Sequence, residues 1–383
     1  MNVLDVDRNR YVDMAAGFGA LLLGHRPDAV ARAIEAQAER LWLALGDVSP
    51  SDVKVALCER LVRLYPQAKA RVILGSTGAD AVTAALKTAA LTTGRAGVVA
   101  FEGAYHGLSH GPLAACGLRP SYREPFAEAL NHHVTFAPYP HDERSFDRAM
   151  TEVERAVAGG NVGAVLVEPI LGRGGCVVPP AGFLPALRAA CDRAEALLVC
   201  DEIWTGLGRS GAWLASVAMG ALPDVVCLGK GLGGGLPISA CIGSARAMAS
   251  WGAHGGTTIH TATHFGSPVH CAAAVATLEA VDGRALPARA QRVGEMWMSR
   301  LRERTTGLSG VREVRGRGLM VGVALEGGGA RGVSVTRRLL SRGWIVLTGG
   351  AQGDVLTLTP PLDIDDSLLD AFCDALADAV AAP

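Results

Sequence analysis

Residues 196–236 read ALLVCDEIWTGLGRSGAWLASVAMGALPDVVCLGKGLGGGL, and this stretch decides the fold. A buried-strand run, Ala196 to Cys200, ends in two acids, of which Asp201 is the first. A second apolar run, Val225 to Leu228, is followed by a glycine and then Lys230. Parallel strands that each present a charged residue at the carboxyl end are how an open α/β sheet builds a ligand site. The stretch therefore predicts such a site.

An acid and a lysine in this arrangement suit pyridoxal 5′-phosphate (PLP). The lysine amine forms a Schiff base with the cofactor aldehyde, and a carboxylate keeps the pyridine nitrogen protonated so that the ring accepts electrons. Successive side chains of a strand point to opposite faces, so Asp201 and Ile203 share one face, while Glu202 points away. We therefore predict Lys230 and Asp201 as catalytic residues that also bind the cofactor, and Ile203 as packing against its ring.

Each of these residues has an ordinary alternative. Taken singly, Asp201 is a strand-end cap and Lys230 is a solvated turn lysine. The glycines around them favour a site instead, because Gly206, Gly208 and Gly211 lie between the two residues and a glycine cluster follows Lys230.

A second turn predicts a place for the cofactor's phosphate. Residues 71–74 read as a short strand and residues 81–92 as a helix, with Thr77, Gly78 and Ala79 between them. A strand, a turn of small residues and a helix aim free backbone N–H groups and the positive helix end at an anion. The alternative is an ordinary tight turn between strand and helix.

The chain resembles the class III (ω-type) aminotransferases of PLP fold type I. Three ordered strings carry the resemblance, VEPILGRGG at 167–175, DEIWTGLGRSG at 201–211 and PDVVCLGKGLGGGLPISA at 223–240. The resemblance extends from Val6 to Leu362. It implies an α/β fold of the aspartate-aminotransferase-like type, with a large, doubly covered, mostly parallel sheet domain and a small α+β domain.

The chain is long enough for two domains. Strand and helix patterns alternate through residues 46–282, which we assign to the large PLP-binding domain. Residues 1–45 and 283–383 together are assigned to the small domain. Residues 108–145 read as loop-rich.

The resemblance implies roles for further residues. It supports the phosphate cradle, places Tyr105 on one face of the pyridine ring and leaves His106 near the ring edge. It adds Glu168 to the cofactor-binding residues. Thr263 is expected to reach the phosphate of the neighbouring subunit's cofactor, so a homodimer with active sites at the subunit interface is expected. The alternatives are a loop histidine at 106 and a capping threonine at 263.

Three positions depart from the family pattern. Relatives that use glutamate or 2-oxoglutarate carry an arginine where this chain has Thr357, and a glutamate that pairs with it where this chain has Arg173. A guanidinium binds a carboxylate through two hydrogen bonds, so Arg173 is a candidate for binding a substrate carboxylate, with a solvent-facing arginine as the alternative. Trp204 replaces a glutamine that contacts the cofactor in relatives, and it either walls the substrate pocket or simply packs.

The resemblance implies a PLP-dependent aminotransferase that moves an amino group from an amine or amino acid to a keto acid by a ping-pong Schiff-base mechanism. The departures leave two alternatives, a PLP-dependent isomerase (aminomutase or amino-acid racemase) and a PLP-binding protein with weak catalysis. A nicotinamide-dependent dehydrogenase is a weaker rival, because the glycines after Lys230 lack the fingerprint with its later ribose-binding acid.

The composition argues against several classes of partner. The net charge of −1 offers no electrostatic footprint for nucleic acid or an anionic membrane. No apolar run reaches the roughly 18 residues of a membrane span. The nine cysteines contain no CxxC pair, which argues against a metal site or disulfide frame. With no signal-peptide pattern at the start, we expect a cytoplasmic homodimer that takes small-molecule substrates and binds no nucleic acid, membrane or metal.

Overall fold

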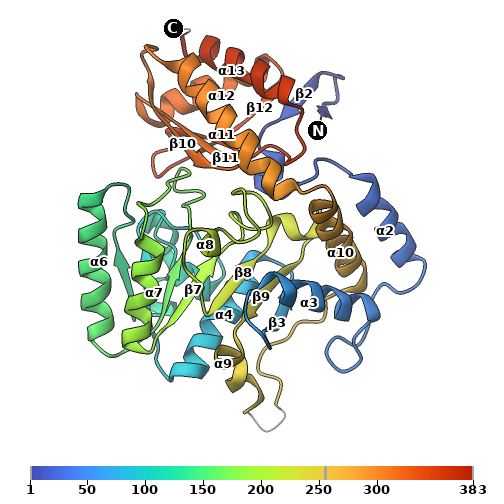
Figure 1. The fold of residues 1–383 in the computed structure, drawn as a ribbon, viewed down its shortest axis with the longest axis vertical. Coiled ribbons are helices and arrows are strands. Elements are labelled where there is room, and N and C mark those ends of the chain that lie inside the picture. The colour runs from blue at the N-terminus through green and yellow to red at the C-terminus, as the bar shows by residue number, and fades with distance from the viewer. Residues whose placement is uncertain (1, 254–256, 382–383) are drawn as a thin grey trace.

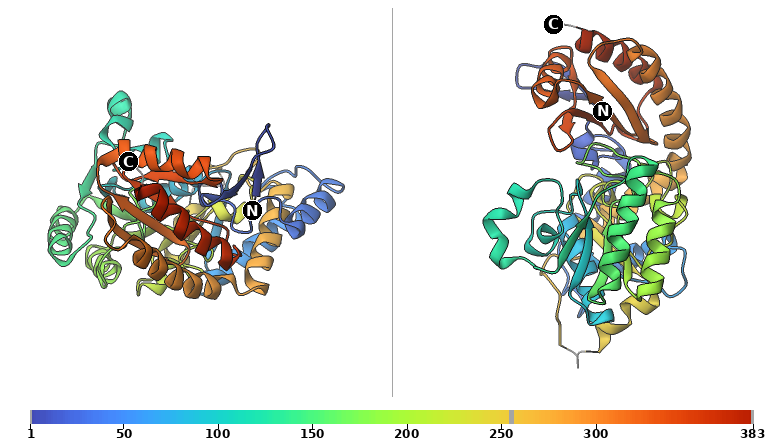
Figure 2. Two further views of the ribbon diagram at one scale, coloured as in Figure 1. Left: turned by 90° about the horizontal axis from the view of Figure 1, so that it is seen from above. Right: turned by 90° about the vertical axis from the view of Figure 1, so that its left-hand side faces the viewer.

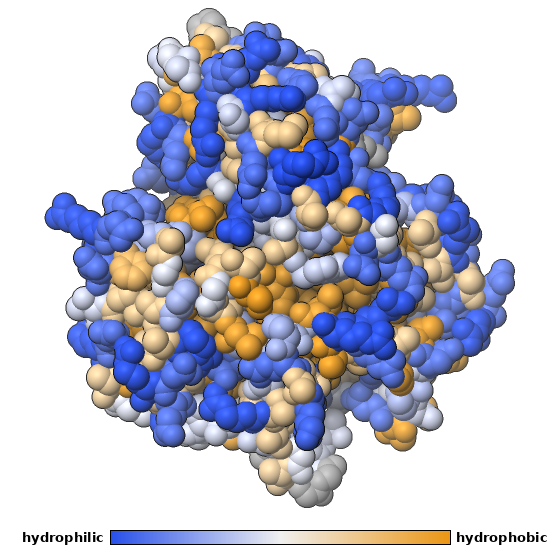
Figure 3. All heavy atoms as spheres, viewed as in Figure 1, coloured by the Kyte–Doolittle hydropathy of each residue, from blue (hydrophilic) through white to orange (hydrophobic). Residues whose placement is uncertain are grey.

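The computed structural model describes residues 2–253 and 257–381. Two bodies are stacked along the long axis of the molecule, a larger lower one and a smaller upper one that holds the C-terminal helices (Figure 1). The right-hand view of Figure 2 again shows the smaller body at one end of the larger one, and in the left-hand view, from above, the two overlap. On the face drawn in Figure 3, hydrophilic residues dominate the upper body and hydrophobic residues gather across the middle of the lower body.

A seven-stranded sheet forms the lower body, in the order β3-β9-β8-β7-β6-β4-β5. Its strands are β3 (Arg71–Gly75), β4 (Gly97–Phe101), β5 (Val134–Ala137), β6 (Val162–Val167), β7 (Leu197–Asp201), β8 (Val225–Leu228) and β9 (Ser239–Gly243). Neighbours from β5 to β8 are parallel, whereas β9 runs antiparallel to both β8 and β3. The predicted mostly parallel sheet is confirmed.

Helices cover both faces of this sheet, as the fold prediction requires. They are α4 (Gly78–Thr93), α6 (Glu143–Ala158) and α7 (Phe183–Ala194). Alternation along β7 sorts the side chains, because Leu198 and Cys200 pack in one hydrophobic cluster with α6 and α7, while Leu197 and Val199 pack in another with α4. A strand that is buried on both faces reads as a continuous apolar run, as the sequence of β7 does.

The upper body is built on an antiparallel sheet in the order β10-β11-β14-β13. A three-stranded sheet of β1, β2 and β12 joins the two ends of the chain, with β2 parallel to β12. The strands and helices of this body are β1 (Asn2–Leu4), β2 (Arg10–Asp13), β10 (Val311–Arg317), β11 (Met320–Leu325), β12 (Trp344–Ile345), β13 (Leu347–Gly349), β14 (Val355–Leu358), α11 (Leu286–Thr305), α12 (Gly328–Ser341) and α13 (Asp366–Ala381). The predicted α+β character of this body is confirmed.

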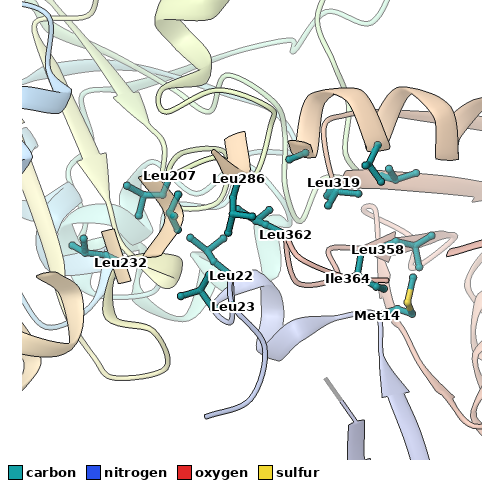
Figure 4. Packing of buried hydrophobic residues seen from close by; sticks show 14 of the residues in the cluster. Met14, Leu22, Leu23, Leu207, Leu232, Leu286, Leu319, Leu358, Leu362 and Ile364 are labelled. Carbon is teal, nitrogen blue, oxygen red and sulfur yellow. The ribbon is translucent and has the colours of Figure 1, made fainter. Parts of the chain in front are cut away.

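One hydrophobic cluster runs from the lower body into the upper one (Figure 4). Leu22 and Leu23 of the N-terminal segment lie beside Leu207 and Leu232 of the lower body and Leu286 at the start of α11 (Figure 4). Helix α10 (Pro268–Gly283) packs against α2 (Asp28–Ala38) and α3 (Asp52–Leu64). The domain limits at 46 and 282 stay a prediction.

Residues 108–145 hold more regular structure than the loop-rich interpretation allowed. They form α5 (His110–Ala114), the short 3-10 helices η1 (Pro120–Tyr122) and η2 (Glu124–Ala129), the edge strand β5 and the start of α6. The other short helices are α1 (Ala16–Gly19), α8 (Ala215–Ala218), η3 (Lys230–Gly233), α9 (Ala245–Met248) and η4 (Ala249–Gly252). Within the described ranges, no helix is long and apolar enough to cross a membrane.

Candidate active site

A cavity of about 500 Å³ opens where β4, β7 and β8 end at their carboxyl ends. All but two of the predicted site residues line it: Thr77, Gly78, Ala79, Tyr105, His106, Glu168, Asp201, Ile203, Trp204 and Lys230. Gly107, Leu108 and Ser109 also line it, and the sequence reasoning missed them. Their signal was position alone, since they directly follow Tyr105 and His106 in the same loop after β4.

The carboxylate of Asp201 is fixed at the end of β7. Its Oδ2 lies 2.7 Å from Nδ1 of His106, and its Oδ1 accepts the backbone N–H of Ile203 at 3.1 Å. Both Asp201 and His106 are buried, and Nε2 of His106 has no hydrogen-bond partner among the described residues. The neighbouring acid, Glu202, points elsewhere and accepts hydrogen bonds from Ser216, as strand alternation predicts. Asp201 is thus a buried carboxylate oriented by an imidazole.

Lys230 lies two residues after the end of β8, separated from it by Gly229. Its backbone has φ of +35°, in the left-handed region that costs a side-chain-bearing residue strain of order 1–3 kcal/mol and is found most often at functional sites. Its Nζ lies 4.5 Å from the centre of the Trp204 ring. Burial lowers the pKa of Lys230, while Asp201 and Glu168 oppose that shift. A lowered pKa enlarges the neutral fraction of the amine, which is its nucleophilic form.

The predicted phosphate cradle is the start of helix α4. Thr77 caps the helix by accepting the Asp80 N–H at 3.3 Å, and Gly78 and Ala79 open its first turn. Backbone N–H groups at these first positions have no partner within the helix and carry its positive end. A Cβ built on Gly78 would lie 2.7 Å from Cδ1 of Ile203, so a larger residue at this position would force the Ile203 side chain to move.

Tyr105 and Arg173 stack on each other beside the cavity. Cζ of Arg173 lies 4.8 Å from the centre of the Tyr105 ring, the geometry of a cation–π contact. Arg173 is not among the residues that line the cavity, and within the described part of the chain it forms no ion pair. It lies over the Tyr105 ring, which also meets the ring of Tyr122 edge-on with centroids 6.4 Å apart.

Glu168 is held by backbone groups on two sides. Its Oε1 accepts the N–H of Tyr105 at 2.8 Å and its Oε2 accepts the N–H of Gly172 at 2.9 Å. Burial raises the pKa of Glu168 to about 7 and the nearby Asp201 carboxylate adds to that shift, whereas His106 and the two hydrogen bonds oppose it. Both carboxyl oxygens therefore accept hydrogen bonds from the backbone of the protein, and a direct contact of Glu168 with a cofactor stays a prediction.

Trp204 is wedged between two glycines. A Cβ on Gly19 would lie 2.2 Å from Nε1 of the indole, and a Cβ on Gly172 would lie 2.4 Å from its Cε3. The N-terminal segment thus backs one wall of the cavity, a role for Gly19 that the sequence did not reveal. Thr263 is exposed and does not line the cavity of its own chain.

The family model for aminotransferase class III matches residues 1–380. The chain belongs to the class III aminotransferases. This family uses PLP, the cofactor that Asp201 and Lys230 indicated from the sequence. In the described residues no cluster of three or more His, Cys, Asp or Glu side chains is arranged to hold a metal ion.

Curated relatives and solved structures agree with this membership. Acetylornithine aminotransferase from Mycobacterium tuberculosis is 38% identical over 377 residues, which cover 98% of this chain and 88% of the relative. 4-Aminobutyrate aminotransferase from the same organism is 34% identical over 405 residues, which cover 98% of this chain and 89% of the relative. The structure of an amine transaminase from an uncultivated Pseudomonas species, solved in its PLP-bound form, superposes with a TM-score of 0.93 at 29% identity, covering 99% of this chain and 92% of that one.

Proposed function

We propose that this class III aminotransferase moves an amino group between an amine or amino acid and a keto acid in the cavity between Lys230 and Asp201. One observation carries the proposal. A buried amine with a lowered pKa and an imidazole-bound carboxylate converge on a single cavity, together with a helix start that suits a phosphate. The enzyme class is that of the family, and the assignment of these residues to their roles is ours.

The residues present fit PLP. Gly78 and Ala79 offer unpaired N–H groups to the phosphate, and the cavity volume lies in the range of about 300–1,000 Å³ that small-molecule sites have. Asp201 is held rigidly by His106 and suits the ring nitrogen. When bound, the cofactor supplies an electron sink for the pair of electrons left when the substrate carbon loses its proton.

The remaining work falls to side chains of the protein. We assign Ile203 and Tyr105, which both line the cavity, to hold a flat ring between them. The amine of Lys230 would hold the cofactor's aldehyde carbon and, when free, would move a proton on and off the substrate carbon that carries nitrogen. Because Asp201 is buried, its charge acts on the ring through a medium of low dielectric constant.

A panel of amines, amino acids and keto acids tests this function, with the absorbance of the bound cofactor as the readout. We expect a matching donor to convert the cofactor to its amine form and to release one carbonyl product per site. A keto acid should then restore the starting spectrum. Exchange of the substrate's α-proton without a carbonyl product would instead identify an isomerase, and no spectral change with any donor would contradict transamination.

We further propose that Arg173 binds a carboxylate of the substrate. Support comes from its place on Tyr105, its lack of an ion pair among the described residues and the neutral Thr357 where relatives have an arginine. The same panel, repeated with Arg173→Ala, should show KM for carboxylate-bearing substrates raised about 10–100-fold, the loss of one charged hydrogen-bonded contact. The KM for amines without a carboxylate should change little. Equal KM changes for both groups of substrates would exclude this role.

We also propose that the enzyme is a homodimer in which Thr263 reaches the partner subunit's active site. An exposed apolar segment supports this, since Leu41, Trp42, Leu45 and Val48 have exposed fractions of 41%, 72%, 73% and 89%. Apolar residues so concentrated on one surface segment mark an interaction site. Light scattering should give a mass in solution of twice the chain mass. The variant Trp42→Glu should have a lower mass in solution, because the dimer dissociates. A monomer that is fully active at nanomolar concentration would contradict the proposal.

The cytoplasm is the location we propose for this enzyme. All nine cysteines are free in the structure and eight of them are buried, which suits a reducing compartment. Fractionation of cells that produce the enzyme tests this, and recovery in a secreted fraction would contradict it.

A further inference from the structure

The loops after β4 and β6 meet beside the cavity. The first carries Tyr105, and the second carries Arg173. Their backbones touch, since a Cβ on Gly174 would lie 2.6 Å from the carbonyl oxygen of Gly103. The stack of Arg173 on Tyr105 therefore depends on how these two loops are held together.

Glu168 lies at the base of both loops. Its backbone is fixed from the core, because the buried hydroxyl of Tyr139 donates to the carbonyl oxygens of Glu168 and Pro169, both at 3.0 Å. From this fixed point one carboxylate oxygen accepts the Tyr105 N–H and the other accepts the Gly172 N–H. Each loop thus has one hydrogen bond to the same carboxylate.

We propose that Glu168 is a positioning residue that ties the two loops together and so sets the Arg173–Tyr105 pair for binding an anionic substrate group. The identity of the substrate group rests on the proposed function. The connection of the two loops through Glu168 does not. Above its pKa of about 7 Glu168 is ionised, and hydrogen bonds from backbone N–H groups to the ionised carboxylate are charge-assisted and stronger than neutral ones. An amide in place of the carboxylate cannot accept on both sides, because one of its ends is a donor.

Amide hydrogen exchange of the full-length, PLP-loaded enzyme measures the tie directly. In Glu168→Gln we expect the N–H of Tyr105 or Gly172 to exchange roughly 10- to 100-fold faster, the loss of one hydrogen bond to a charged group. Glu202→Gln is the matched control. Glu202 is a buried carboxylate that accepts the backbone N–H groups of Ala215 and Ser216, so its variant should speed exchange there and not at the cavity.

Kinetics then separate positioning from a purely structural role. Glu168→Gln should raise KM for carboxylate-bearing substrates about tenfold with kcat nearly unchanged. The KM of Glu168→Asp should lie between those of Glu168→Gln and the native enzyme. Unchanged exchange at both Tyr105 and Gly172 would overturn the tie, and so would a loss of thermal stability with KM unaltered. If the native enzyme transfers no amino group, the proposed function fails, yet the exchange measurement still decides whether Glu168 joins the loops.

Discussion

Lys230→Ala is expected to give a folded protein that no longer holds PLP covalently and turns over at least about 10³-fold more slowly than the native enzyme. The variant removes both the amine that attaches to the cofactor and the group that moves the substrate proton. Its fold should survive. Burial lowers the pKa of Lys230, so a charged lysine in this cavity is unfavourable, and its loss should not lower the unfolding midpoint of the cofactor-free protein.

The small number of lysines makes this prediction sharp. The chain has four, Lys54, Lys69, Lys87 and Lys230. Reduction with borohydride followed by peptide mass spectrometry should find the cofactor mass on the peptide with Lys230 alone. Lys87→Ala is the matched control, since Lys87 lies on α4 outside the cavity lining and donates to the carbonyl oxygen of Ile259. Cofactor mass on any of the other three lysines in the native enzyme would refute the assignment.

The second large effect is expected at Asp201. Asp201→Asn replaces a buried carboxylate by a neutral amide of the same shape, so the ring nitrogen of the cofactor loses its charged partner. We expect kcat to fall by about 10²–10³-fold, the size found when one preorganised electrostatic contact is removed from an active site. The cofactor should still bind, because the cradle at Gly78 and the amine of Lys230 are untouched. Stopped-flow absorbance of the donor half-reaction measures the effect.

Asp224→Asn separates this electrostatic effect from the general cost of removing a buried charge. Asp224 is also a buried carboxylate, bound by Arg188 and Arg246 at 2.6 Å each, but it lies outside the cavity lining. Its variant should lose thermal stability, with kcat of the folded protein within about twofold of native. A native kcat in Asp201→Asn, or an equal loss of kcat in both variants, would remove Asp201 from its role.

Much of the fold and the cavity was predictable because the signals are local. Buried strands such as β7 and β8 are continuous apolar runs, and each is followed closely by a charged residue. The carboxyl ends of parallel strands lie at one edge of a sheet, so residues that follow them in sequence meet in space. This rule predicted that Asp201 and Lys230 share one site, whereas His106 was implied only by the family resemblance.

The parts that escaped prediction depend on contacts between distant segments. The reversal of β9 is the exception, because it had a local signal: the connection after β8 is shorter than the dozen or more residues that a parallel crossover needs. Strand β5 had little local signal in the sequence, because Val134–Ala137 is short and lies at the sheet edge. No local sequence signal indicated the two hydrogen bonds that Glu168 accepts or the stack of Arg173 on Tyr105. They arise only when the loops after β4 and β6 come side by side.

The hairpin of β8 and β9 limits how Lys230 moves during turnover. Pairing runs from Val225 opposite Gly243 to Leu228 opposite Ala240, and β3 holds the far side of β9. The strands on either side of the connection that carries Lys230 are therefore fixed in the sheet, while Lys230 itself lies outside it, at the start of η3. Because those strands hold the connection at both ends, we expect the Lys230 amine to reach and leave the cavity by rotation about the bonds of its flexible four-carbon arm rather than by movement of the sheet.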